Sequence, residues 1–114
     1  MLAKKYRLKS NSDISKVFRD GKTVKSSFLF LKYCENQESH FRIAISVGLN
    51  YSKKAPSRNR VKRVLRASMH PLLEDIKPGY DLVFFFSKDF QAEIKLKESR
   101  ILVKECLSRA NLLK

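Results

Sequence analysis

The longest uninterrupted apolar run of the chain is LVFFF at residues 82–86, directly after Asp81. It is far shorter than the roughly 20 residues that span a bilayer, so it does not predict a transmembrane helix. Its length and aromatic composition are typical of a strand that is covered on both faces. With the turn residues Pro78 and Gly79 before it, the run predicts a strand over residues 81–86 at the centre of a sheet. The remaining segments must then supply neighbouring strands and covering helices.

Two periodicities in the N-terminal half predict one helix followed by strands. Apolar residues recur at helical spacing over residues 12–20, which predicts a helix that ends at Gly21. Alternating side chains predict strands over residues 28–33 and 41–47, and we expect these two strands to form an antiparallel pair. The segment 22–25 is a candidate for a further strand.

The C-terminal half predicts two more helices. Ser57 is expected to cap a helix whose apolar positions run from Val61 to Leu73, and a last helix is expected within residues 89–113. The order is then αβββαβα, an α+β single-domain sandwich in which helices cover one sheet. The length agrees with one domain over residues 1–114, since compact domains are typically about 100–150 residues long.

Charge patterning favours a polyanion as the partner. Lysine and arginine number 25 against 11 acidic residues, which gives a formal net charge of +14. No acidic residue lies between Ser39 and Leu73, and the helix expected there carries cations on the side opposite its apolar positions. Arginine suits phosphate because its planar fork donates two hydrogen bonds at once. The alternative is a merely solvated basic face. The candidate polyanion-binding residues are Arg58, Asn59, Arg60, Lys62, Arg63 and Arg66, with Lys53 and Lys54 in the loop before them.

An aromatic surface is expected beside this helix. Phe28 and Phe30 share a face of the first long strand with Lys32, and a second strand presents Arg42 and Ser46 together. If these faces coincide and are uncovered, unpaired bases can stack on the rings while cations hold the backbone. Phe18 of the first helix would then form a wall of this groove. Each ring taken singly is also typical of core packing, so both interpretations stay open.

Other classes of function find little support in the sequence. His40 and His70 have no cysteine or carboxylate at metal-ligand spacing, and no triad or paired-carboxylate arrangement is evident, so neither a metal site nor a catalytic site is expected in this chain. Cys34 and Cys106 form no C-x-x-C motif and are expected to be ordinary buried or half-buried thiols. The N-terminal segment lacks the apolar stretch of a secretory signal, which favours a cytoplasmic protein.

The basic stretch SRNRVKRVLR at residues 57–66 resembles the signature of the bacterial ribonuclease P protein component, in which R-N-R-x-K-R-x-x-R begins a helix. Further segments stand in family order: Arg7-Leu8-Lys9, then the first helix up to Gly21, then FRIAISV at residues 41–47, then the strand from Asp81. The resemblance therefore covers nearly the whole chain. It implies an α/β sandwich similar to a ribosomal-protein domain, with a left-handed βαβ crossover, which departs from the usual right-handed rule.

The same resemblance implies a noncatalytic role within an RNA enzyme. In the family, the large RNA subunit binds the Mg²⁺ ions and removes the 5′ leader from precursor transfer RNA, while the small protein binds that RNA and the leader. The basic helix is then assigned to the catalytic RNA, with Asn59 reaching a metal ion through water at most, and the protein itself holds no cofactor. Neither DNA nor a membrane is expected as a partner. The implied leader-binding cleft comprises Ile14, Phe18, Phe28, Phe30, Lys32, Arg42 and Ser46.

The sequence departs from the family pattern at three places. Ile14 and Lys32 stand at positions that are often aromatic, so we expect weaker stacking on the leader and stronger phosphate contact. The lysine pair that often follows the strand ending at Val47 comes later, at Lys53 and Lys54. Two alternatives remain open. One is a ribosomal or general RNA-binding module, and the other is a DNA-binding protein that inserts the basic helix into a major groove.

Overall fold

The computed structural model describes residues 3–47, 54–87 and 94–114. The elements follow in the order α1 (Asn11–Asp20), β1 (Lys22–Ser26), β2 (Leu29–Glu35), β3 (Arg42–Ser46), α2 (Ala55–Met69), β4 (Tyr80–Phe86) and α3 (Leu96–Arg109), with short 3-10 helices at Lys4–Tyr6 and His70–Asp75. The α+β class and the order αβββαβα are therefore confirmed. Within the described ranges, no helix is long and apolar enough to cross a membrane.

The four strands form one mixed sheet in the order β1-β2-β4-β3. β4 is antiparallel to β2 and parallel to β3, so the apolar run lies inside the sheet as predicted. The expected antiparallel pair of β2 and β3 is wrong, because β4 lies between them. β2 instead forms a hairpin with β1, through a turn in which Ser27 takes a positive φ of 54°. An interior strand is hydrogen-bonded along both of its edges, and β4 takes that place between the two strands β2 and β3, which are consecutive in sequence.

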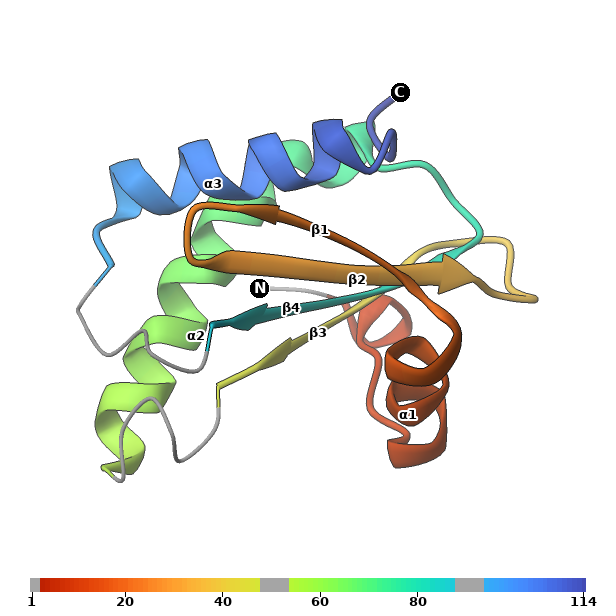
Figure 1. Cartoon of the computed structure of the whole chain (residues 1–114), viewed down its shortest axis with the longest axis horizontal. Coiled ribbons are helices and arrows are strands. Elements are labelled where there is room, and N and C mark those ends of the chain that lie inside the picture. Colours follow the sequence, from red (N-terminus) through yellow and green to blue (C-terminus); the bar gives the residue numbers. More distant parts are fainter. Residues whose placement is uncertain (1–2, 48–53, 88–93) are drawn as a thin grey trace.

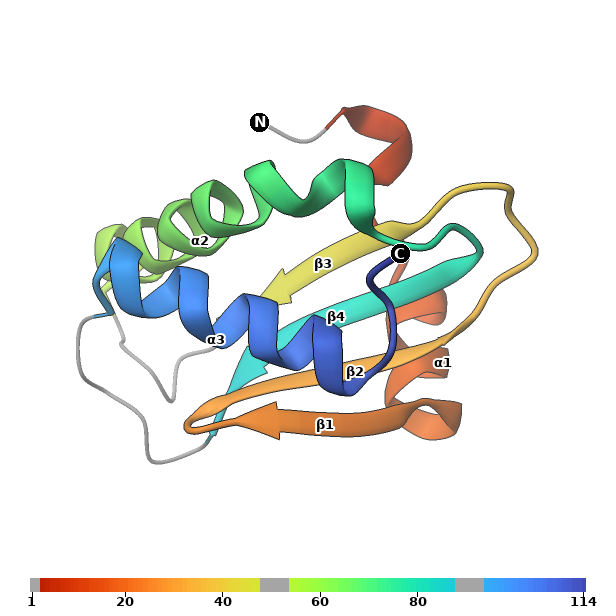
Figure 2. The same ribbon diagram turned by 90° about the horizontal axis from the view of Figure 1, so that it is seen from above.

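The chain passes from β3 through α2 to the parallel neighbour β4 by a left-handed crossover. In Figure 2 both strands point to the left, α2 and α3 lie on the viewer's side, and β4 lies below β3. With the helix in front and the strands turned to point upward, the second strand is then to the left of the first. This is the handedness that the family resemblance implies and that periodicity cannot predict.

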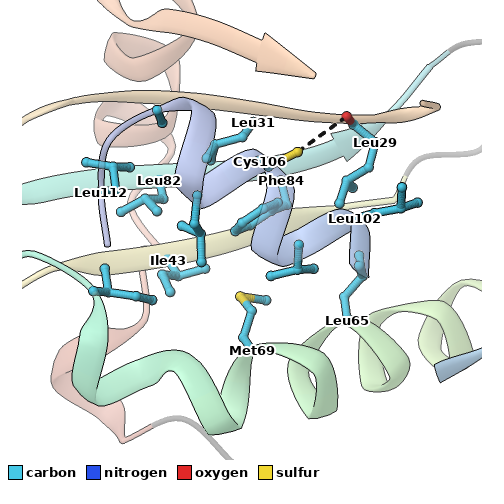
Figure 3. Packing of buried hydrophobic residues seen from close by; sticks show 14 of the residues in the cluster. Leu29, Leu31, Ile43, Leu65, Met69, Leu82, Phe84, Leu102, Cys106 and Leu112 are labelled. Atoms are coloured by element: carbon cyan, nitrogen blue, oxygen red, sulfur yellow. Dashed lines mark hydrogen bonds between the residues drawn. The ribbon is translucent and has the colours of Figure 1, made fainter. Parts of the chain in front are cut away.

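Helices cover the two faces of the sheet unequally. α2 and α3 lie side by side on one face, and α1 lies on the other (Figures 1 and 2). The main core fills the space between the sheet and the α2–α3 layer, where Leu65, Met69 and Leu102 meet Leu31 and Phe84 (Figure 3). A smaller cluster of Leu8, Val17 and Val83 lies under α1. Because α1 is short, much of this second face has no helix over it.

The ends of the helices follow local capping rules with two exceptions. Ser10 caps α1 by accepting a hydrogen bond from the backbone N–H of Asp13, and Gly21 ends the helix as predicted. α2 begins before the expected cap Ser57, since Lys54 is its first flanking residue and a proline stands in its first turn. Proline fits there because the first helical N–H groups have no partner within the helix. α3 begins at Leu96, several residues later than expected.

Candidate nucleic-acid interface

The basic sequence of α2 lies on the side of the helix that faces away from the core. Val61 and Leu65 are buried, and Arg60, Arg63 and Arg66 are exposed on the other side. Because α2 contains no acidic residue, no carboxylate within the helix neutralises these cations. Of the remaining candidates, Asn59 and Lys54 are exposed, Arg58 and Lys62 are half-buried, and Lys53 lies outside the described residues.

A groove of about 930 Å³ runs between α2, β3 and the segment before α1. Arg63, Arg66 and His70 form its α2 side, and Arg7 and Lys9 approach it from the N-terminal segment. The other lining residues are Leu8, Ile14, Ile43, Ala44, Ile45 and Ala67. The backbone of the N-terminal segment is fixed beside β3, because the N–H of Leu8 donates to the carbonyl oxygen of Ile43 at 2.9 Å. Arg7 and Lys9 could be identified from the sequence only as markers of family order, although cations directly before the first helix were a signal for this groove.

The sheet face under α1 presents a row of side chains that crosses all four strands. The strand register places Lys25 beside Phe30, Phe30 beside Phe85, and Phe85 beside Ser46. The rings of Phe30 and Phe85 stack at 5.3 Å with an interplanar angle of 14°. Phe18 of α1 lies 5.3 Å from the ring of Phe85 and is 39% exposed. We call Phe18, Phe30 and Phe85 the aromatic row.

Phe85 is the member of this row that sequence reasoning missed. The run 82–86 was interpreted as core on both faces, and Leu82 and Phe84 do belong to the main core. The other residues of β4 alternate to the α1 face, where Asp81 and Val83 are buried and Phe85 is only half-buried. The charged residue at the start of the strand was the signal that this face is different.

Phe28 does not belong to the aromatic row. It precedes β2 in the turn after Ser27, so the strand alternation does not extend to it. Its ring packs against the main core and lies 6.0 Å from the ring of Phe86. The expectation that Phe28 and Phe30 share a face is therefore wrong. Ile14 lines the groove and packs on the small cluster under α1, and Ser46 is exposed at the end of β3.

The two cations expected in the cleft both contact other parts of the protein. Arg42 donates from Nε and Nη2 to the two carboxylate oxygens of Asp81, each at 2.8 Å, and from Nη1 to Asp13 at 3.4 Å. The hydrogen bond to Asp81 raises the pKa of Arg42, so its guanidinium stays charged. Lys32 donates from Nζ to the carbonyl oxygen of Phe18 at 3.3 Å. Stronger phosphate contact by Lys32, expected from its place in the sequence, therefore competes with a contact inside the protein.

The described residues hold no group of three or more histidine, cysteine or acidic side chains that could bind a metal ion. The imidazole of His40 packs edge-on against Tyr6. Both cysteines are free, Cys34 half-buried and Cys106 buried, and burial is the first cause that raises the pKa of each thiol. Neither thiol is therefore poised as a nucleophile.

A cationic helix beside a partly uncovered aromatic sheet face is typical of small basic α+β proteins that bind RNA. Comparison with known proteins identifies the family. The model of the ribonuclease P family matches residues 2–111, and the chain belongs to this family. The ribonuclease P protein component of Oceanobacillus iheyensis is 39% identical over 111 residues, which cover 93% of this chain and 91% of that relative. The protein component of Listeria innocua is 42% identical over 89 residues, which cover 76% and 73%.

Solved structures agree in fold. The ribonuclease P protein of Staphylococcus aureus, a mutant with defective mRNA degradation activity, superimposes with a TM-score of 0.84 at 24% identity and covers 96% of this chain and 92% of its own. The protein of Thermotoga maritima gives a TM-score of 0.79, also at 24% identity, over 90% and 96% of the two chains. The chain is thus the protein component of an enzyme built from RNA and protein, and RNA is its partner.

Proposed function

We propose that this protein is an accessory subunit that binds both the catalytic RNA of ribonuclease P and the 5′ leader of precursor transfer RNA. The RNA subunit performs the cleavage, and the protein contributes affinity and placement of the substrate. The observation that carries this proposal is the meeting of two unlike surfaces at β3. Ala44 lines the cationic groove, while Ser46 ends the row that contains Phe30 and Phe85.

The groove side suits a folded RNA. Its exposed arginines contact phosphates and release counterions, so binding falls with salt and needs no particular base sequence. We assign Arg58, Asn59, Arg60, Lys62, Arg63 and Arg66 to the catalytic RNA, together with Lys53 and Lys54, which precede them in the sequence. The catalytic RNA holds the Mg²⁺ ions, and the uncharged Asn59 reaches one of them through water. The protein itself supplies no cofactor.

The aromatic row suits a single strand. A 5′ leader has unpaired bases, and each base has a face that stacks on a phenylalanine ring whatever its sequence. Duplex DNA offers no such unstacked bases, so DNA is not proposed as a partner, nor is a membrane. The protein works with its RNA in the cytoplasm.

Leader release in a reconstituted reaction tests the proposal. The purified protein is mixed with a bacterial ribonuclease P RNA and a precursor transfer RNA at low magnesium, where the RNA alone is slow. A large acceleration that the protein alone does not produce is the expected result. Cleavage by the protein alone would require a catalytic site in this chain, and no effect with several such RNAs would favour a general RNA-binding module.

The role of α2 is tested separately with Arg63→Ala and Arg66→Ala. Each variant is expected to weaken binding of the catalytic RNA by about 1–3 kcal/mol and to lower the salt slope by about one unit. Arg100→Ala is the matched control, since Arg100 is exposed on α3 and lies outside the groove. Equal losses in all three variants would reduce the effect to net charge and remove the groove from the mechanism.

A further inference from the structure

The sheet holds α1 by a cation at each end of the helix. At the N-terminal end, Arg42 of β3 reaches Asp13 in the first turn, with Nη1 and Oδ2 3.4 Å apart. At the C-terminal end, Lys32 of β2 donates to the carbonyl oxygen of Phe18 at 3.3 Å, and its Nζ lies 5.8 Å from the centroid of the Phe18 ring. A carboxylate near a helix N-terminus and a cation near its C-terminus also complement the helix dipole.

Few other contacts fix the position of α1. Val17 is its only fully buried residue, packed with Leu8 and Val83, and Ile14 is partly buried against the same cluster. With the ring contact of Phe18 on Phe85, these apolar contacts span about one turn of the helix, so they constrain its orientation less than a longer buried face would. The two polar contacts add fixed points on either side of Val17, at Asp13 in the first turn and at the Phe18 carbonyl in the last.

The Arg42 guanidinium already gives three of its five N–H groups to carboxylates of the protein. Asp81 takes Nε and Nη2 in a bidentate pair, and its side chain is only 5% exposed. Asp13 takes the remaining nitrogen, Nη1. A phosphate could reach only the two other N–H groups of a side chain that is 21% exposed, and the charge it would meet is already matched by two carboxylates.

We propose that Arg42 and Lys32 are positioning residues, which fix α1 so that Phe18 lies against Phe85 and completes the aromatic row. This inference rests on the proposed leader-binding function and assigns these two cations to the wall of the cleft rather than to the leader itself. Phe18 is the part that moves if the contacts are lost, since Phe30 and Phe85 are fixed by the pairing of β2 with β4.

Asp13→Asn tests the proposal, because positioning and simple charge predict opposite results. Removing a negative charge from the RNA-facing side should tighten binding of any RNA if charge alone matters. If Asp13 holds α1 in place, the variant should instead lose leader preference, measured as the ratio of holoenzyme affinities for precursor and mature transfer RNA. The expected loss is about threefold to fivefold, the size typical of a partly exposed ion pair.

The matched control is Asp20→Asn at the other end of the same helix. Asp20 pairs with the exposed Arg19 at 3.2 Å, within α1. The Asp20→Asn substitution therefore makes the same change in net charge without removing an ion pair to the sheet. Asp13→Glu, which keeps the carboxylate, is expected to restore part of the preference. A thermal unfolding curve of each variant confirms that the protein is folded before affinities are compared.

The outcomes distinguish a failure of the proposed function from a failure of the positioning role. A wild-type holoenzyme without any preference for the leader would overturn the proposed function itself. If the wild type prefers the leader and Asp13→Asn leaves this preference unchanged or increases it, as is expected of Asp20→Asn, only the positioning role is overturned. Arg42→Lys gives a second reading, since lysine keeps the charge but cannot bridge two carboxylates as the fork does. Retained leader preference in that variant would also contradict the proposal.

Discussion

The ion pair between Arg42 and Asp81 allows a quantitative prediction of stability. Asp81 is 3% exposed, and its carboxylate accepts two hydrogen bonds from Arg42 and one from Asn36, all at 2.8 Å. Arg42→Ala leaves the buried charge with the neutral Asn36 as its remaining side-chain partner. Removing one partner of a buried ion pair typically costs about 3–5 kcal/mol, most of it the penalty of an uncompensated charge. We expect a loss of that size in the free energy of unfolding.

Urea unfolding followed by circular dichroism measures this loss. Arg19→Ala is the matched control, because the Arg19–Asp20 pair has side chains that are 71% and 50% exposed and should contribute little. The double variant Arg42→Met with Asp81→Leu removes both charges and should recover most of the stability. A loss from Arg42→Ala no larger than that from Arg19→Ala would refute the reasoning, since Asp81 would then be solvated well enough to stand alone.

Three further predictions concern the core, the end of α1 and the aromatic row. Burial raises the pKa of Cys106 to about 11, so the thiol keeps its proton to a higher pH in the folded state than in the unfolded state, and the free energy of unfolding should fall by up to about 3 kcal/mol as pH rises from about 9 to 11. Urea unfolding of the wild type and of Cys106→Ala at pH 8 and pH 10.5 isolates this effect, and an equal change in the free energy of unfolding of both proteins would contradict it. Gly21→Ala should lower the melting temperature, because the added methyl group meets the carbonyl oxygen of Tyr33 at 2.9 Å; an unchanged melting curve would show that the chain relaxes there. Phe30→Ala and Phe85→Ala should each weaken binding of precursor over mature transfer RNA by about 1–3 kcal/mol; equal losses for both RNAs would assign the rings to packing alone.

Local pattern was sufficient to predict that three helices and the central strand exist, although α2 and α3 begin at other residues than expected. The stop of α1 at Gly21 and the interior place of β4 both follow from residues that are close in sequence. The pairing of β2 was predicted wrongly, because hairpin reasoning favours consecutive strands and cannot see that β4 inserts between β2 and β3. Strand order depends on contacts between residues far apart in the chain, which periodicity does not encode.

The candidate site divides in the same way. The cations of α2 could be placed on one face from helical geometry alone, and Arg63 and Arg66 are exposed as expected. On the sheet, the sequence identified Arg42 and Lys32 as charged but could not identify their partners, since Asp81 lies far along the chain and the Phe18 carbonyl is a backbone group. Phe85 was missed because the run in which it lies is apolar throughout.

These differences predict that salt affects the two surfaces unequally. Each phosphate contact by an exposed cation of α2 adds about 0.7–0.9 to the slope of log affinity against log salt, so binding of the catalytic RNA should fall steeply. The leader preference should change little, because stacking on Phe30 and Phe85 is not screened and Arg42 is already neutralised by carboxylates within the protein. Holoenzyme affinities for precursor and mature transfer RNA, measured from low to moderate potassium chloride, give the ratio directly. A ratio that falls with salt as steeply as the affinity for the catalytic RNA would mean that cations on the sheet face bind the leader phosphates. Arg42 and Lys32 would then be residues that contact RNA directly.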